Sequence, residues 1–296
     1  MSASGFDARR FKTLERAGFN RIAARYADTA HLRAALADAL LDAAELAPGQ
    51  TVLDLASGPG LLARAAAQRV QPGGWVLASD IAEEMLAEGA RRAADEATGA
   101  THDDAGAAHA GGPAAVSFAA ADAEHLCVPD TSFDRVLAGL ALFMFPHPDN
   151  ALAEMRRALR PGGRVVLSVW GVRDEVPLIA RAQDCIARLL PAPKVARPSV
   201  FRFGEPAVLE AALGAAGFGD VRITPCRFTC TFADAAEYWQ AFLDLAGGAA
   251  EALARLPDAT QQQLRDAVTD ELAPHRPPDG AGYAVDALAL VASARA

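Results

Sequence analysis

Short apolar runs alternate with helix-periodic stretches over the middle of the chain. Each run has strand length, and Leu152, Met155 and Leu159 repeat at helical spacing before the last of them. We expect strands at Val52–Leu55, Trp75–Ser79, Val116–Ala119, Phe133–Ala138 and Gly163–Val169. Strands that alternate with helices predict an α/β fold, with a parallel sheet and helices on both of its faces.

Other periodic segments flank this alternating region. Phe11–Leu46 is expected to be helical, because Leu32, Leu36 and Leu40 share one helical face, and Pro48-Gly49 ends the pattern. Later segments predict helices over 174–190, 205–216 and 235–272, and strands over 221–232 and 283–292.

The segment 93–113 interrupts the alternation. It is rich in Gly and Ala and poor in bulky apolar residues, so we expect a mobile loop. His102, Asp103, Asp104 and His109 fall within it, and the composition favours a solvated segment over a metal site. No metal is predicted for this chain.

The residues that carry chemistry cluster where the first three strands end. Asp54 lies in the first strand, which runs into the turn Gly58-Pro59-Gly60 and then into a helix. Glycine lets a ligand approach the backbone closely, and a helix N-terminus offers free N–H groups. Asp80 closes the second strand 20 residues after Gly60, where an acid binds ribose hydroxyls, and Asp122 follows the third strand. The pattern predicts a nucleoside-binding crevice.

The same turn also matches the dinucleotide fingerprint, so an NAD(P)-dependent oxidoreductase is the first alternative. Asp54 would repel a pyrophosphate, and Pro59 removes an N–H from the turn. Three acids at successive strand ends suit a cationic, hydroxyl-rich ligand better. A Tyr-x-x-x-Lys pair is also missing, since the lysines are Lys12 and Lys194.

From Phe19 to Gly171 the chain resembles the class I S-adenosylmethionine-dependent methyltransferases, in particular the small-molecule group that includes the ubiquinone/menaquinone C-methyltransferases. The resemblance rests on F-N-R-I-A-A-R-Y (19–26), V-L-D-L-A-S-G-P-G (52–60), S-D-I (79–81), A-A-D-A-E-H-L (120–126) and the long run 132–170, which contains L-R-P-G-G-R-V-V-L. It implies a Rossmann-like seven-stranded, mostly parallel sheet with an antiparallel last strand. It further implies an N-terminal helical cap (1–48), a cofactor-binding core (49–171) and a part (172–296) that covers the substrate and completes the same domain.

The resemblance also assigns residues to S-adenosylmethionine and its product S-adenosylhomocysteine. Asp54 would hold the methionine ammonium, Asp80 the ribose hydroxyls and Asp122 the adenine amino group. The full set is Tyr26, Asp54, Ala56, Gly58, Gly60, Asp80, Ile81, Asp122, Ala123, Gly139 and Leu140. Ala56 replaces the first glycine of the family's turn, and we expect it to need no positive φ.

For the methyl acceptor, the apolar residues Phe143, Met144 and Trp170 near the strand ends are candidate pocket residues for a flat ring. His147, between two prolines after the fourth strand, is the candidate catalytic base, with a surface histidine as the alternative. A fixed base is optional, because the sulfonium methyl is already electrophilic.

Charge and composition limit the partners. The formal net charge of −9 over 296 residues argues against a nucleic-acid substrate. There is no apolar stretch long enough to span a membrane, no signal core, and four cysteines without a C-x-x-C pair, which predict a cytoplasmic protein. We expect a small-molecule methyltransferase, a monomer or homodimer, whose acceptor is quinone-like, aromatic or a secondary metabolite. A second alternative is a catalytically inactive methyltransferase-like partner protein.

Overall fold

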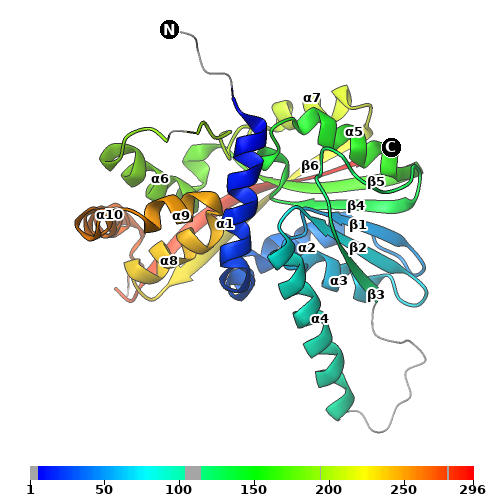
Figure 1. Cartoon of the computed structure of the whole chain (residues 1–296), viewed down its shortest axis with the longest axis horizontal. Coiled ribbons are helices and arrows are strands. Elements are labelled where there is room, and N and C mark those ends of the chain that lie inside the picture. The colour runs from blue at the N-terminus through cyan, green and yellow to red at the C-terminus, as the bar shows by residue number, and fades with distance from the viewer. Residues whose placement is uncertain (1–5, 104–114, 194, 279) are drawn as a thin grey trace.

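The computed structural model describes residues 6–103, 115–193, 195–278 and 280–296 (Figure 1). Its centre is a single seven-stranded sheet in the order β3-β2-β1-β4-β5-β7-β6. The strands are β1 Thr51–Leu55, β2 Trp75–Asp80, β3 Ala115–Ala120, β4 Phe133–Gly139, β5 Leu159–Trp170, β6 Gly219–Phe232 and β7 Tyr283–Arg295.

Strands β1 to β5 run parallel, and β7 is antiparallel to both β5 and β6. The predicted Rossmann-like, mostly parallel sheet is therefore confirmed, including its antiparallel last strand. All five residues of β1 are buried, as expected for a strand covered on both faces. Because strand order reverses between β1 and β4, a crevice forms there at the carboxyl ends of the strands.

Helices cover both faces of the sheet. The α-helices are α1 Ala8–Asp28, α2 Ala34–Ala43, α3 Leu61–Arg69, α4 Glu83–Asp103, α5 Pro148–Ala158, α6 Pro177–Leu189, α7 Pro206–Ala215, α8 Ala235–Leu245, α9 Gly248–Ala254 and α10 Asp258–Glu271. Short 3-10 turns lie at η1 Thr29–Arg33, η2 Leu142–Met144, η3 Arg173–Glu175 and η4 Ala273–His275. The predicted leucine stripe is confirmed, since Leu32, Leu36 and Leu40 are buried.

The expectation of a loop over 93–113 is wrong for its first half. Helix α4 continues to Asp103, and the rest of this segment, 104–113, lies outside the described residues. Alanine has the highest helix propensity, so an alanine-rich stretch extends a helix that is already nucleated. The i,i+4 ion pair between Arg91 and Asp95, with a 2.7 Å N–O distance, supports the same helix.

Helix α1 lies between the two halves of the molecule (Figure 1). It contacts α4 on one side and α8 and α9 on the other. Gly18 allows the close approach to α9, because a Cβ there would meet the Gly248 nitrogen at 2.3 Å. The helices α6, α8, α9 and α10 gather on the far side of α1 from α3 and α4 (Figure 1), so α1 forms a wall between the strand ends and these helices.

Over the described ranges, no helix has both the length and the apolar character to cross a membrane.

Candidate active site

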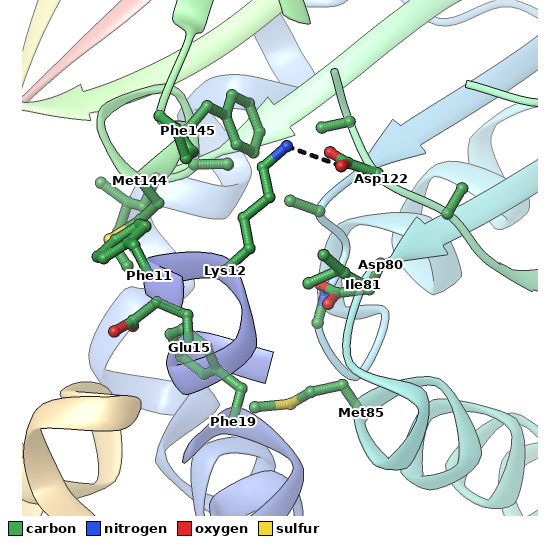
Figure 2. Close-up of a pocket in the computed structure, with 18 of the residues that line it drawn as sticks. Phe11, Lys12, Glu15, Phe19, Asp80, Ile81, Met85, Asp122, Met144 and Phe145 are labelled. Atoms are coloured by element: carbon green, nitrogen blue, oxygen red, sulfur yellow. Dashed lines mark hydrogen bonds and ion pairs between the residues drawn. The ribbon is translucent and has the colours of Figure 1, made fainter. Parts of the chain in front are cut away.

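A cavity of about 120 Å³ lies between α1 and the carboxyl ends of β1, β2, β3 and β4. Figure 2 shows Asp80, Ile81 and Asp122 on one side of it, with Phe11, Glu15 and Met144 on the other. Nine predicted cofactor residues line this cavity: Tyr26, Ala56, Gly58, Asp80, Ile81, Asp122, Ala123, Gly139 and Leu140.

The turn after β1 is shaped by residues with positive φ. Gly58 and Gly60 have φ of 54° and 72°, and Ala56 also has φ of 54°. The expectation that Ala56 needs no positive φ is therefore wrong, because the turn imposes this conformation on whichever residue stands there. A side chain in this region costs roughly 1–2 kcal/mol. Leu140, just after β4, has φ of 51°. Backbone strain is therefore stored after both β1 and β4, the two strands between which the strand order reverses.

Asp80 fixes this turn through its carboxylate. Oδ2 accepts a hydrogen bond from the Gly58 N–H at 2.9 Å, and Oδ1 accepts one from Ala82 at 2.8 Å. Burial raises the pKa of Asp80, and the backbone hydrogen bonds oppose that rise. Each oxygen keeps a second lone pair, so the carboxylate can still accept hydroxyl groups.

Asp54 is wholly buried and has no hydrogen-bond partner for either oxygen among the described residues. Burial raises its pKa to about 8, the nearby Ala63 backbone N–H opposes part of that rise, and the Asp80 charge adds to it. Asp54 lines a second, smaller cavity next to the first, together with Ala56, Leu140 and Arg33. An orphaned buried carboxylate of this kind is a site for a cationic group.

Arg33 is a residue that the sequence reasoning missed. It is 8% exposed, and no carboxylate of the described residues lies within ion-pair distance of it. Its guanidinium donates to the Tyr26 carbonyl at 3.0 Å and lies 4.1 Å from the centre of the Tyr26 ring. One cavity is thus lined by a buried arginine and a buried acid.

Lys12 and Glu124 were also missed. Lys12 Nζ donates to Asp122 Oδ2 at 2.7 Å, a contact shown in Figure 2, and to Glu124 Oε2 at 2.8 Å. These bonds tie α1 to the segment just after β3. Burial opposes protonation of Lys12, but its hydrogen bonds to the two acids outweigh burial and raise its pKa. Although burial disfavours the charged form of Asp122, the hydrogen bond from Lys12 keeps the pKa of Asp122 low. A lysine 110 residues away carries no sequence signal for this pairing.

The candidate pocket residues lie in a third cavity of about 600 Å³. Phe143, Met144 and Trp170 line it, together with parts of α6, α8 and α9 and residues 190–193 and 197–200. Residues that line both this cavity and the first one are Phe11, Phe19, Tyr26, Leu140 and Met144. The two cavities therefore share a wall.

Two predicted residues lie outside the cavities. Gly60 is the N-cap of α3, and a Cβ there would meet the Phe118 ring at 3.2 Å, so it serves packing of the turn. His147 is the exposed N-cap of α5 and lines none of the three cavities. Its backbone N–H donates to Glu124 Oε1 at 2.8 Å.

Comparison with known proteins finds similarity over the central part of the chain. Residues 53–167 match the family model described as a methyltransferase domain. The ubiquinone/menaquinone biosynthesis C-methyltransferase of Bordetella avium is 41% identical over 124 residues, which cover 42% of each chain. That of Methylococcus capsulatus is 39% identical over 145 residues, 49% of this chain and 52% of the relative. The chain thus spans about half the length of the curated relatives it matches.

Solved structures agree on the fold. The YcgJ protein of Bacillus subtilis gives a TM-score of 0.57 at 19% identity, covering 88% of this chain and 97% of that one. Phosphoethanolamine N-methyltransferase 2 of Haemonchus contortus, solved with S-adenosyl-L-methionine, gives 0.51 at 19% identity, covering 88% and 52%. Residues 53–167 thus match a methyltransferase domain, and the fold is similar to that of these solved structures. The resemblance to S-adenosylmethionine-dependent methyltransferases that the motifs predict is confirmed for residues 53–167.

Proposed function

We propose that this chain is an S-adenosylmethionine-dependent methyltransferase that acts on a small molecule. The observation that carries the proposal is the charge pattern of two adjoining cavities. Asp54 and Arg33 line one of them, and Asp80 and Asp122 line the other. An amino acid end with an ammonium and a carboxylate, followed by ribose and an adenine amino group, needs this order of partners.

The residues present fit this cofactor. Asp54, buried without a partner, would accept the ammonium, and Arg33 would donate to the carboxylate. Asp80 would accept the ribose hydroxyls, and Asp122, kept ionised by Lys12, would accept the adenine amino group. Gly58 leaves the backbone open there, with the Tyr26 ring as the nearest atom to an added Cβ at 3.5 Å. Ile81 and Tyr26 supply apolar contact beside these polar groups.

S-adenosylmethionine supplies a methyl group on a sulfonium, which any correctly placed O, N or C nucleophile can attack. The work of the chain is then to orient an acceptor and to exclude water. Orientation supplies about 7–11 kcal/mol of the barrier. Tyr26, Leu140 and Met144 line both the first cavity and the large third cavity, so they would bring an acceptor against the methyl group.

The acceptor is proposed to be quinone-like, aromatic or a secondary metabolite. Two observations support this: the large apolar cavity beside the cofactor site and the names of the relatives, which are ubiquinone/menaquinone biosynthesis C-methyltransferases. We further propose that the protein works in the cytoplasm as a monomer or homodimer. We also propose that it has no nucleic-acid partner, because its net charge of −9 disfavours contact with phosphates.

Neither alternative gains support from the comparisons. The oxidoreductase reading rests on the glycine turn alone. A [4+2]-cyclase, SpnF, shares the fold at a TM-score of 0.52 and 21% identity. Fold therefore does not decide the chemistry.

The experiment that tests the proposal is isothermal titration of the purified chain with S-adenosylmethionine, S-adenosylhomocysteine and NADPH. We expect micromolar binding of the first two and no heat from the third. Binding of NADPH alone, or silence from all three, would overturn the proposed function.

A further inference from the structure

The lining and the volume of the third cavity limit the kind of ligand that it can bind. Aliphatic and aromatic side chains dominate its wall, with Phe143, Trp170 and Ile186 among them. Its volume of about 600 Å³ is in the range of pockets that enclose a drug-sized ligand. A large apolar cavity favours a bulky ligand that leaves water with most of its surface.

Two charged residues, Arg33 and Arg197, line this cavity among the described residues. Arg33 also lines the smaller cavity with Asp54, where the proposed function uses it for the cofactor. Arg197 follows α6 in a proline-rich part of the chain that contains Pro191, Pro193 and Pro198.

Arg197 is held in place by a buried acid. Its Nη1 lies 2.5 Å from Glu15 Oε1, and the Glu15 side chain is 7% exposed. The guanidinium carbon also lies 5.8 Å from the centre of the Phe11 ring, one helical turn before Glu15 on α1. Burial raises the pKa of Glu15, and the Arg197 charge lowers it.

This pair sets the electrostatics of the cavity. Glu15 cancels the charge of Arg197, so the wall around Arg197 offers hydrogen-bond donors without a net positive charge. The other cation, Arg33, would pair with the carboxylate of the bound cofactor. Arginine has five N–H donors in a fixed fork, and the contact with Glu15 leaves others free. A neutral oxygen can accept from them, whereas an anion would also meet the nearby Glu15 carboxylate.

Resting on the proposed function, we propose that Arg197 is a specificity residue of the acceptor site, which favours a neutral carbonyl or ether-type oxygen over an anion on a bulky, mostly apolar acceptor. Arg197 donates a hydrogen bond to that oxygen and fixes how the acceptor faces the cofactor. Glu15 is a positioning residue, which acts by holding and neutralising Arg197.

The test uses a neutral fluorescent probe, N-phenyl-1-naphthylamine, on the chain saturated with S-adenosylhomocysteine. Three competitors of one shape then displace it: 1-acetylnaphthalene with a carbonyl, 1-ethylnaphthalene without an oxygen, and the anion 1-naphthoate. For the unmodified chain we expect the ketone to compete about 5–10-fold better than the other two, the scale of one hydrogen bond of about 1 kcal/mol.

The variants separate a specificity role from a structural one. Arg197→Met keeps the length and apolar packing, and should remove the preference for the ketone. Glu15→Gln keeps the shape but leaves Arg197 uncompensated, so 1-naphthoate should gain about tenfold and become the best competitor. A merely structural pair would lower all three affinities together and would overturn the assignment.

Location is tested by a matched pair on α9. Ala249→Phe fills the cavity and should weaken the probe at least tenfold, while the exposed Ala254→Phe, outside its lining, should not. Equal competition by 1-naphthoate and the ketone on the unmodified chain would also overturn the proposal. A separate titration with S-adenosylhomocysteine keeps the two hypotheses apart. If S-adenosylhomocysteine binds but the probe does not, only the proposal for the acceptor site is refuted. If S-adenosylhomocysteine does not bind, the proposed function is refuted.

Discussion

The two sides of the site are built in opposite ways. The proposed cofactor side consists of acids in or just after strands, all drawn from the stretch 51–140. Backbone N–H groups hold Asp80 and a lysine holds Asp122, while Asp54 is buried without a partner. The acceptor side is an apolar cavity assembled from α1, α6, α8, α9 and residues 190–193 and 197–200. Polar groups must be fixed one by one to bind a defined ligand, whereas an apolar wall needs only shape. The first side therefore keeps motifs that the second side does not need.

The largest effect is expected where α1 is tied to the cofactor side. Lys12→Met leaves the nearly buried Glu124 without its counter-charge, which should lower the free energy of unfolding by about 3 kcal/mol in urea titrations. Arg16→Met on the same helix removes an exposed ion pair with Glu83 and should cost less than about 1 kcal/mol. If the two variants lose equal stability, the Lys12 contact does not fasten α1. The double variant Lys12→Met/Glu124→Gln should recover part of the loss.

Asp54, on the proposed cofactor side, predicts that the stability of the chain depends on pH. Its folded pKa of about 8 lies above the unfolded value of about 3.9, so stability is fully present at low pH and falls as pH rises toward 8. Between pH 5.5 and 7.5 the chain should lose about 1.4 kcal/mol per pH unit from this group. Asp54→Asn should remove that slope in urea titrations repeated at four pH values. A variant with the slope of the unmodified chain would mean that Asp54 is ionised when folded.

Asp80 contacts the glycine turn and is proposed to bind the ribose, so its variants test how the cofactor side binds its ligand. Asp80→Ala should weaken S-adenosylhomocysteine by about 1.5–3 kcal/mol, the scale of hydrogen bonds to a charged group. Asp80→Asn keeps one carbonyl oxygen as an acceptor and should lose less. Calorimetry of both variants against the unmodified chain measures the difference, and unchanged affinity in Asp80→Ala would remove the ribose assignment.

A substitution at Ala56 should raise the stability of the chain, by a smaller amount than the Lys12 variant lowers it. Ala56→Gly should relieve the positive φ and stabilise the chain by up to about 1 kcal/mol, after the extra entropy of glycine in the unfolded state. Ala65→Gly, within α3, should destabilise by about 1 kcal/mol, because its backbone is helical. Thermal melting of both variants gives the comparison. A loss of stability in both would show that Ala56 is not strained.

His147 should give the smallest effect. Its contact with Glu124 is made by the backbone N–H, which His147→Ala preserves. Turnover and cofactor affinity should both stay within twofold of the unmodified chain. A large fall in turnover at constant affinity would instead support its role as a base.

The sequence predicts what depends on local pattern. The strands, the glycine turn and the acids Asp54, Asp80 and Asp122 follow from hydrophobic period and position at strand ends. Partners distant in sequence do not: Lys12 reaches Asp122 across 110 residues, and Glu15 reaches Arg197 through the packing of α1 against the segment 190–200. The φ of Ala56 was missed for a related reason, since backbone geometry is set by the turn as a whole.

The central claim is that the chain moves a methyl group from the polar side to a molecule on the apolar side. The direct measurement incubates it with methyl-labelled S-adenosylmethionine and an organic extract of apolar small molecules, with Asp80→Ala as the control. The account predicts label in low-mass, organic-soluble product that grows with time and protein and falls at least tenfold in the control. Label that enters only protein or nucleic acid, or none that leaves the cofactor while calorimetry shows binding, would contradict it.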